Sequence, residues 1–271
     1  MKKELSIKEL CNLEYQDKGL VVPIGYASKK KLTFIDFKDN SGLFIAGATG
    51  TGKSILIDVL IVGLMYKNKP EDIKFIMLDP KKIELGEYDG ISYLFNEKSQ
   101  TKKETGYKLL IDLLKILEFR IKLLKITNHR NINGYNRDNK EKLPHIFVVV
   151  DEGSEIIKIK DSFTVFSKIL DFGEYVGVHL IYATNDYLKK YSNSKFLDKF
   201  NYLLTFDLAS LEQEKYINIA GANWLKGNGN ALLKTKIGKI YKFQVPYITD
   251  EEIKDVVLKN QINSVYKVRS L

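Results

Sequence analysis

The sequence has little cysteine, little arginine and no long hydrophobic run. Cys11 is the single cysteine of 271 residues, which excludes a disulfide within the chain and favours a reducing compartment. The longest apolar runs, Ile55–Met65 and Ile146–Val150, are too short to cross a bilayer, and the first contains Asp58. The first five residues, MKKEL, lack the apolar segment of a signal peptide. We therefore expect a cytoplasmic protein with no direct membrane insertion.

The scarcity of arginine shapes the interpretation of the charge. The formal net charge is +9, and nearly all of the 43 basic residues are lysines. A basic surface attracts polyanions such as nucleic acid, and lysine suits non-specific attraction to phosphates better than bidentate reading of bases. A proteome that is generally rich in lysine would explain the same net charge. Net charge alone therefore selects no partner.

Apolar strand patterns alternate with helical patterns along the chain. Short β-like pieces are expected at 21–26 and 32–35, further strands at 43–46, 73–78, 146–150, 178–183 and 202–206, helices at 54–66, 103–126, 211–219 and from Asp250, and a hairpin at 227–245. This alternation predicts an α/β fold with a mostly parallel central sheet flanked by helices. No repeat or linker divides the chain. We expect one motor domain, residues 41–271, with a short β-rich extension, residues 1–40, packed on it.

A glycine-rich loop lies between the strand at 43–46 and the helix at 54–66. Its sequence fits G-x-x-x-x-G-K-[ST] at every fixed position, with the residues Gly47, Ala48, Thr49, Gly50, Thr51, Gly52, Lys53 and Ser54. Glycines let backbone N–H groups turn toward phosphates, and the helix start adds a favourable dipole. Lys53 would reach the β- and γ-phosphates of ATP, and Ser54 would ligate Mg²⁺. The loop predicts a nucleotide-hydrolysing P-loop ATPase.

Two carboxylates follow the apolar strand at 146–150. A P-loop ATPase needs one carboxylate in the Mg²⁺ shell and a base that orients the attacking water. Asp151 suits the metal and Glu152 suits the water, although an Asp-Glu pair could also merely cap a following helix. Asp79, after the strand at 73–78, is a second carboxylate that could belong only to a structural turn.

Several motifs in order resemble the FtsK/SpoIIIE family of DNA translocases. They extend from about residue 40 to 255 and comprise the phosphate loop with Ile45-Ala46 before it, Phe75–Lys81 with Glu84-Leu85, Tyr88 and Gly90-Ile91, Arg130–Asn136, Leu143–Glu152, Gly177–Thr184, and Gly227–Gly229 with Leu232. The resemblance implies a RecA-like motor that forms a homo-oligomeric ring, usually a hexamer, around double-stranded DNA. ATP sites would lie between subunits. Thr184 or Asn185 would sense the γ-phosphate, if this pair is not simply the end of a strand.

This chain departs from the family pattern at two site positions. The family usually continues Ala-Thr with Gln-Arg-Pro, whereas this chain has Asn185-Asp186-Tyr187. Lys215 stands where the family carries an arginine, and lysine is a poorer arginine finger because it lacks the rigid fork. Arg120, Arg130 or Arg137 could serve instead in trans, or each could be a surface or packing residue.

The resemblance leaves three functional hypotheses. The first is a DNA-translocating motor that serves transfer, maintenance or packaging of a plasmid, integrative element or phage. We expect this because the membrane spans, linker and winged-helix module of chromosomal members are not seen. The second is an FtsK-like coupling or secretion ATPase that acts with a relaxase, replication or membrane-channel partner. The third is an ATP-gated DNA clamp. Lysines near the late hairpin are candidate phosphate contacts, namely Lys226, Lys234, Lys236, Lys239 and Lys242.

Overall fold

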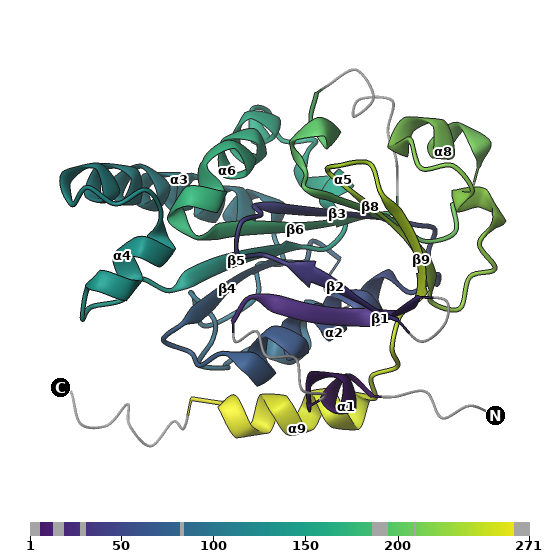
Figure 1. Cartoon of the computed structure of the whole chain (residues 1–271), viewed down its shortest axis with the longest axis horizontal. Helices are drawn as coiled ribbons and strands as arrows, with labels where there is room; N and C mark the ends of the chain where they lie inside the picture. Colours follow the sequence, from purple (N-terminus) through teal and green to yellow (C-terminus); the bar gives the residue numbers. More distant parts are fainter. Residues whose placement is uncertain are drawn as a thin grey trace.

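A single mixed β-sheet forms the centre of the protein (Figure 1). The structure is a computed structural model, and it describes residues 6–12, 19–27, 31–81, 84–185, 195–208 and 210–262. Within these residues the sheet has nine strands in the order β2-β1-β9-β8-β7-β3-β6-β5-β4. The strands are β1 (Val21–Ala27), β2 (Leu32–Asp36), β3 (Gly42–Ala46), β4 (Ile73–Leu78), β5 (His145–Val150), β6 (Val178–Thr184), β7 (Tyr202–Thr205), β8 (Asn230–Thr235) and β9 (Ile240–Gln244).

The sheet has a parallel half and an antiparallel half. Strands β7, β3, β6, β5 and β4 run parallel to one another, and their residues are nearly all buried. Because helices cover both faces of this half of the sheet, the sequences of its strands are nearly continuous runs of apolar residues. Strands β8, β9, β1 and β2 continue the sheet in antiparallel pairs. The predicted parallel sheet and the late hairpin are confirmed, and the antiparallel strands extend that sheet beyond its parallel half.

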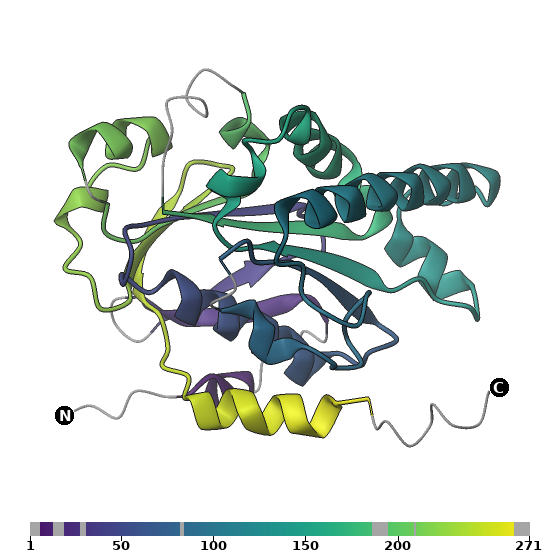
Figure 2. The ribbon, with the colours of Figure 1, turned by 180° about the vertical axis from the view of Figure 1, so that it is seen from behind.

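Helices pack on both faces of this sheet, as Figures 1 and 2 show from opposite sides. The helices are α1 (Ile7–Asn12), α2 (Lys53–Lys67), α3 (Lys103–Ile126), α4 (Ile132–Asp138), α5 (Gly153–Ile156), α6 (Ser162–Val176), α8 (Leu211–Ile217) and α9 (Asp250–Asn260). One buried cluster joins α2 and α9 to the sheet, and a second joins α3 and α6 to its other face. The two clusters are the two layers of core that a covered sheet requires.

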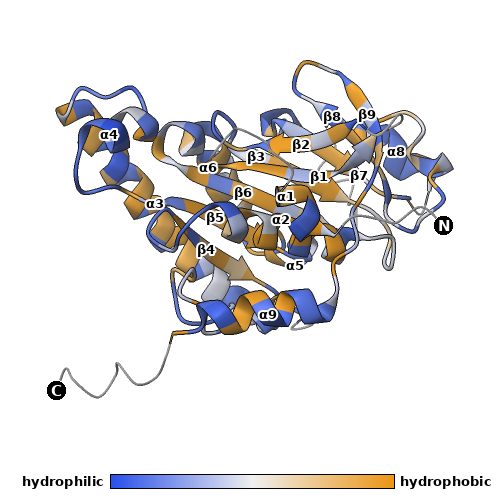
Figure 3. Cartoon of the chain, turned by 60° about the horizontal axis from the view of Figure 1, so that its bottom comes forward, coloured by the Kyte–Doolittle hydropathy of each residue, from blue (hydrophilic) through white to orange (hydrophobic). Residues whose placement is uncertain are grey.

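The covering helices differ in how much of their surface is apolar. Helix α2 is buried nearly all round because it lies between the sheet and α9. Helix α9 carries a narrower apolar face formed by Ile253, Val256 and Val257, and in Figure 3 it alternates between hydrophobic and hydrophilic residues, whereas β3, β5 and β6 are largely hydrophobic. None of the helices in the described residues is long and apolar enough to cross a membrane.

Four helices, α1, α4, α5 and α6, lie where the sequence analysis placed none. Helix α6 has apolar residues at helical spacing, including Val165, Phe166 and Ile169, so the signal was present. Helix α1 lies in the region expected to hold only strands and turns, and its Ile7 is fully buried in the cluster around α2. The expected strands at 21–26 and 32–35 are confirmed as β1 and β2. Because β1 pairs with β9, these strands belong to the same sheet as the rest, and a boundary near residue 40 stays a prediction.

Candidate functional site: a phosphate-binding edge

The chemically active residues of the predicted site meet at the carboxyl end of the parallel strands. In the pairing register Ala46 lies beside Thr184, and Leu78 lies beside Val150. The phosphate loop, Asp79 and Asp151 therefore follow the carboxyl ends of neighbouring strands and lie on the same side of the sheet, which we call the carboxyl edge. A cavity of about 660 Å³ lies there, and its lining includes residues 49–55, Lys81, Glu84, Asp151, Glu152, residues 228–229 and residues 244–247. Ligands of open α/β sheets bind at this edge.

The phosphate loop owes its shape to glycines and to short internal hydrogen bonds. Gly50 and Gly52 have φ of 77° and 120°, a region that favours glycine. The Thr51 hydroxyl donates to the carbonyl oxygen of Ala48 over 2.8 Å. A Cβ on Gly47 would lie 2.8 Å from the Cβ of Phe206, so that position also requires glycine. Helix α2 begins directly after the loop, at Lys53, which is the geometry predicted for phosphate binding.

Lys53 is held inside this loop. Its ammonium donates to the carbonyl oxygens of Gly47 and Ala48, over 2.8 and 2.9 Å. Burial lowers the pKa of Lys53, and the negative charges of Glu152 and Asp151 oppose that shift. A buried ammonium within the phosphate loop is placed to contact bound phosphates.

Asp151 lies where a divalent cation would offset an excess of negative charge. Burial, and after it the negative charges of Glu152, Asp79 and Glu84, together raise the pKa of Asp151 to about 7. A Mg²⁺ ion would favour the ionised form by neutralising these charges. Mg²⁺ needs only one or two protein oxygens in addition to phosphate and water. Asp151 and the Ser54 hydroxyl at the start of α2 fit that donor set.

Glu152 has an unusual backbone and an incompletely satisfied side chain. It adopts left-handed φ and ψ of 53° and 49°, which is uncommon for a residue with a Cβ. Its Oε1 lies 2.9 Å from the Nζ of Lys81, whereas its buried Oε2 has no hydrogen-bond partner among the residues that the structure describes. Gly153 follows because a Cβ there would lie 2.2 Å from the buried ring of Tyr182. Strain and an unsatisfied carboxylate oxygen are features of functional sites.

Asp79 organises the backbone of the neighbouring loop. It is completely buried, and its oxygens accept hydrogen bonds from the backbone N–H groups of Lys81, Glu84 and Leu85. These contacts are those of the structural turn that the sequence analysis left open.

The predicted sensor residues lie at the same edge but outside the cavity lining. Thr184 ends β6 and is 1% exposed, and Asn185 is half-buried. Of the described residues, neither lines the cavity at the phosphate loop. Their sensor role stays a prediction. Asp186 and Tyr187, the other departures from the family pattern, lie outside the described residues.

Three of the four finger candidates remain accessible. Arg120 is 4% exposed and donates to the carbonyl oxygens of Val176 and Pro144, over 2.8 and 2.9 Å, so it is a packing residue. Lys215 is exposed on α8. Arg130 and Arg137 are also exposed, at the amino end of the parallel strands.

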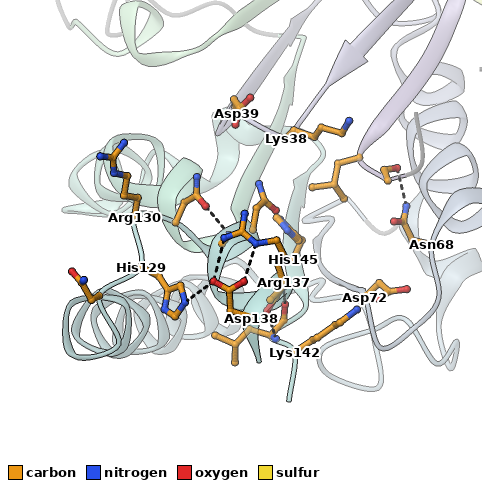
Figure 4. A pocket seen from close by; sticks show the side chains of 18 residues that line it. Lys38, Asp39, Asn68, Asp72, His129, Arg130, Arg137, Asp138, Lys142 and His145 are labelled. Atoms are coloured by element: carbon orange, nitrogen blue, oxygen red, sulfur yellow. Dashed lines mark hydrogen bonds and ion pairs between the residues drawn. The ribbon is translucent and has the colours of Figure 1, made fainter. Parts of the chain in front are cut away.

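Arg130 and Arg137 are among the residues that line a second large cavity (Figure 4). It has a volume of about 860 Å³ and lies at the far end of α2 from the phosphate loop, about 22 Å away by helix length. Arg137 forms a two-bond ion pair with Asp138, and His129 contacts the same carboxylate. Two asparagines of the Arg130–Asn136 segment have structural roles: Asn131 caps α4, and Asn136 exchanges two hydrogen bonds with the backbone of Leu143.

The late glycine segment, which the sequence analysis assigned no role, completes the nucleotide cavity. Gly227, Asn228 and Gly229 all have positive φ, of 66°, 52° and 78°. The N–H of Gly229 donates to the carbonyl oxygen of Thr51 in the phosphate loop over 3.2 Å. No local pattern could have shown this contact, because it joins segments far apart in the chain.

A family model described as the FtsK/SpoIIIE family matches residues 14–198. The chain belongs to the FtsK/SpoIIIE family. A curated relative, the DNA translocase FtsK of Lactiplantibacillus plantarum, is 31% identical over 279 residues, which cover 94% of this chain and 35% of the relative. The chain thus spans about a third of the length of the curated relatives it matches.

Solved structures share the fold of this FtsK/SpoIIIE family member. The cytoplasmic domain of the type VII secretion ATPase EccC from Thermomonospora curvata has a TM-score of 0.81 at 22% identity, over 96% of this chain and 34% of that one. The pCW3 conjugation coupling protein TcpA, in its monomer form with ATPγS, has a TM-score of 0.75 at 21% identity, over 90% and 71%. At these identities the likeness shows the fold alone. The predicted RecA-like P-loop ATPase fold is confirmed.

Proposed function

We propose that the chain is the ATP-driven motor of a DNA translocase that moves double-stranded DNA through a homo-oligomeric, hexameric ring. The observation that supports this most directly is the cavity that brings Lys53, Asp151 and Glu152 together in a member of the FtsK/SpoIIIE family. In this proposal the ring serves transfer, maintenance or packaging of a plasmid, integrative element or phage.

The site residues divide the chemistry of hydrolysis among them. Lys53 and the backbone N–H groups of the loop would hold the β- and γ-phosphates, and Ser54 and Asp151 would hold Mg²⁺, which would supply positive charge to the phosphates. Glu152 orients the attacking water and accepts its proton. Thr184 or Asn185 senses the γ-phosphate, and a neighbouring subunit supplies a cation in trans.

Steady-state ATP hydrolysis with no DNA, single-stranded DNA and long duplex DNA tests the proposal, with Lys53→Ala as the blank. We expect long duplex to stimulate turnover strongly and Lys53→Ala to abolish it. Stimulation only by a protein partner would indicate a coupling or secretion ATPase instead. Nucleotide binding without turnover under any condition would indicate an ATP-gated clamp.

The β8–β9 hairpin is the proposed contact with DNA phosphates. Its tip turns at Gly238 and exposes Lys236 and Lys239, whereas Lys234 donates to the carbonyl oxygen of Asn218. We expect Lys236→Glu with Lys239→Glu to weaken duplex binding and to lower the salt slope by about 2, since each phosphate contact contributes about 0.9. Lys254→Glu on α9 is the matched control. An unchanged slope in the hairpin variant would refute this contact.

A further inference from the structure

Two ammonium groups line the nucleotide cavity, and they have different partners. Lys53 donates to carbonyl oxygens of the phosphate loop. Lys81 instead lies 2.9 Å from Oε1 of Glu152, the residue proposed to activate water. Its side chain is 43% exposed, whereas that of Glu152 is 11% exposed. The lysine therefore reaches from the rim of the cavity to a carboxylate at its wall.

A hydrogen bond to Asp79 holds the backbone N–H of Lys81, although the lysine side chain is half-exposed. Asp79 accepts a hydrogen bond from the N–H of Lys81 over 3.2 Å, and its second oxygen accepts from Glu84 and Leu85. Asp79 itself is completely buried at the end of β4, next to β5. The loop thus anchors one end of the lysine, and the flexible side chain leaves the ammonium free to change partners within the cavity.

The pair restrains the carboxylate on its accessible side. Oε1 of Glu152 is bound to Lys81, and the buried Oε2 has no partner among the described residues. In this arrangement the ammonium is held against the accessible oxygen of Glu152, and the other oxygen is buried. The γ-phosphate of ATP carries more negative charge than one carboxylate, so it can compete for the same ammonium.

We propose that Lys81 is a positioning residue that holds Glu152 through Oε1 until the γ-phosphate of ATP takes over the ammonium. Oε1 is then released and can accept a proton from the attacking water. ADP lacks the competing phosphate, so the pair stays closed with ADP. This inference rests on the proposed function for the role of Glu152.

A double-mutant cycle in nucleotide affinity tests the exchange. The proteins are the full chain, Lys81→Gln, Glu152→Gln and the double variant, and the probes are ATPγS and ADP. If ATP must break the pair, Glu152→Gln tightens ATPγS binding about ten- to a hundredfold more when Lys81 is present than when it is replaced, which is the value of one charged hydrogen bond. For ADP the two backgrounds should give the same change.

Equal tightening of ATPγS in both backgrounds would overturn the proposal, because fixed charges acting without exchange are additive. Lys81→Met, a second neutral variant, must give the same result as Lys81→Gln. Lys158→Gln is the matched control, since Lys158 pairs with Glu155 within eight residues of the end of β5, and neither residue lines the cavity. It should leave the cycle unchanged. Failure of the proposed function is a separate result, because it would appear as ATPγS binding without DNA-stimulated turnover in the unaltered chain.

Discussion

Acidification should weaken the fold through two imidazoles buried between β5 and β6. His179 is completely buried, and its Nδ1 donates to the carbonyl oxygen of Asn40 over 2.7 Å. A carbonyl oxygen only accepts, so Nε2 of His179 must accept from Nδ1 of His145, 2.9 Å away. A second proton on His179 would break that bond and place a charge in the core, where Arg120 is already positive.

The size of this effect follows from the pKa of His179. The pKa of His179 is lowered from 6.5 to about 4, mainly by burial; the hydrogen bond to Asn40 opposes this shift, and the charge of Arg120 adds to it. Burial also lowers the pKa of His145. The unfolded chain therefore binds more protons than the folded one between pH 6.5 and 4. The stabilisation is complete above pH 6.5 and is lost as the pH falls toward 4. At 1.36 kcal/mol for each pH unit it amounts to about 3 kcal/mol.

Urea unfolding of the unaltered chain and of His179→Gln at several pH values isolates the contribution of His179 to the free energy of unfolding. The comparison is needed because Asp58 and Asp151 have pKa values raised to about 7, which change stability in the opposite direction. We expect the difference in unfolding free energy between the two proteins to shrink by up to about 3 kcal/mol between pH 6.5 and 4. Imidazole NMR signals should show His179 neutral at pH 5. A difference that stays constant with pH would refute the reasoning.

Two further substitutions test packing, one at Gly153 beside the candidate site and one at Arg120 in α3. Gly153→Ala should lower the free energy of unfolding, measured in urea, by about 1–3 kcal/mol, because the new Cβ would lie 2.2 Å from the ring of Tyr182. Gly86→Ala is the control, since a Cβ there would have no atom within 4 Å. Equal urea midpoints for the two variants would contradict the predicted clash. Arg120→Met should cost about 2 kcal/mol by leaving two carbonyl oxygens unsatisfied, without changing ATP affinity, whereas the exposed Arg137→Met should change stability by less than about 0.5 kcal/mol. Loss of ATP affinity in Arg120→Met would return that residue to the site.

Local patterns predicted the elements whose causes are local. The phosphate loop could be read because Gly50, Gly52 and Lys53 perform their roles within eight consecutive residues. The buried strands could be read from continuous apolar runs, and the long helix α3 from its spacing of leucines. Helix α6 carried a comparable signal that the sequence analysis did not use.

Residue type alone could not assign roles that depend on surroundings. Arg120 lies within α3 and Arg130 lies shortly after it. Arg120 is buried and donates to two carbonyl oxygens, whereas Arg130 is exposed. Asp79 and Asp151 both follow apolar strands, yet Asp79 accepts hydrogen bonds from its own loop, while Asp151 lies in the cavity lining. Burial and partner choice are properties of the packed chain.

By itself the sequence indicated a P-loop ATPase and placed two carboxylates at the end of a strand, since these signals are contiguous, and its resemblance to the FtsK/SpoIIIE family implied the RecA-like class. Only the tertiary structure decided that Lys81 meets Glu152 and that Gly229 closes against Thr51. The physical reason is the register of the sheet. Parallel strands bring the ends of distant segments to one edge, and the distances there depend on how every strand between them is paired.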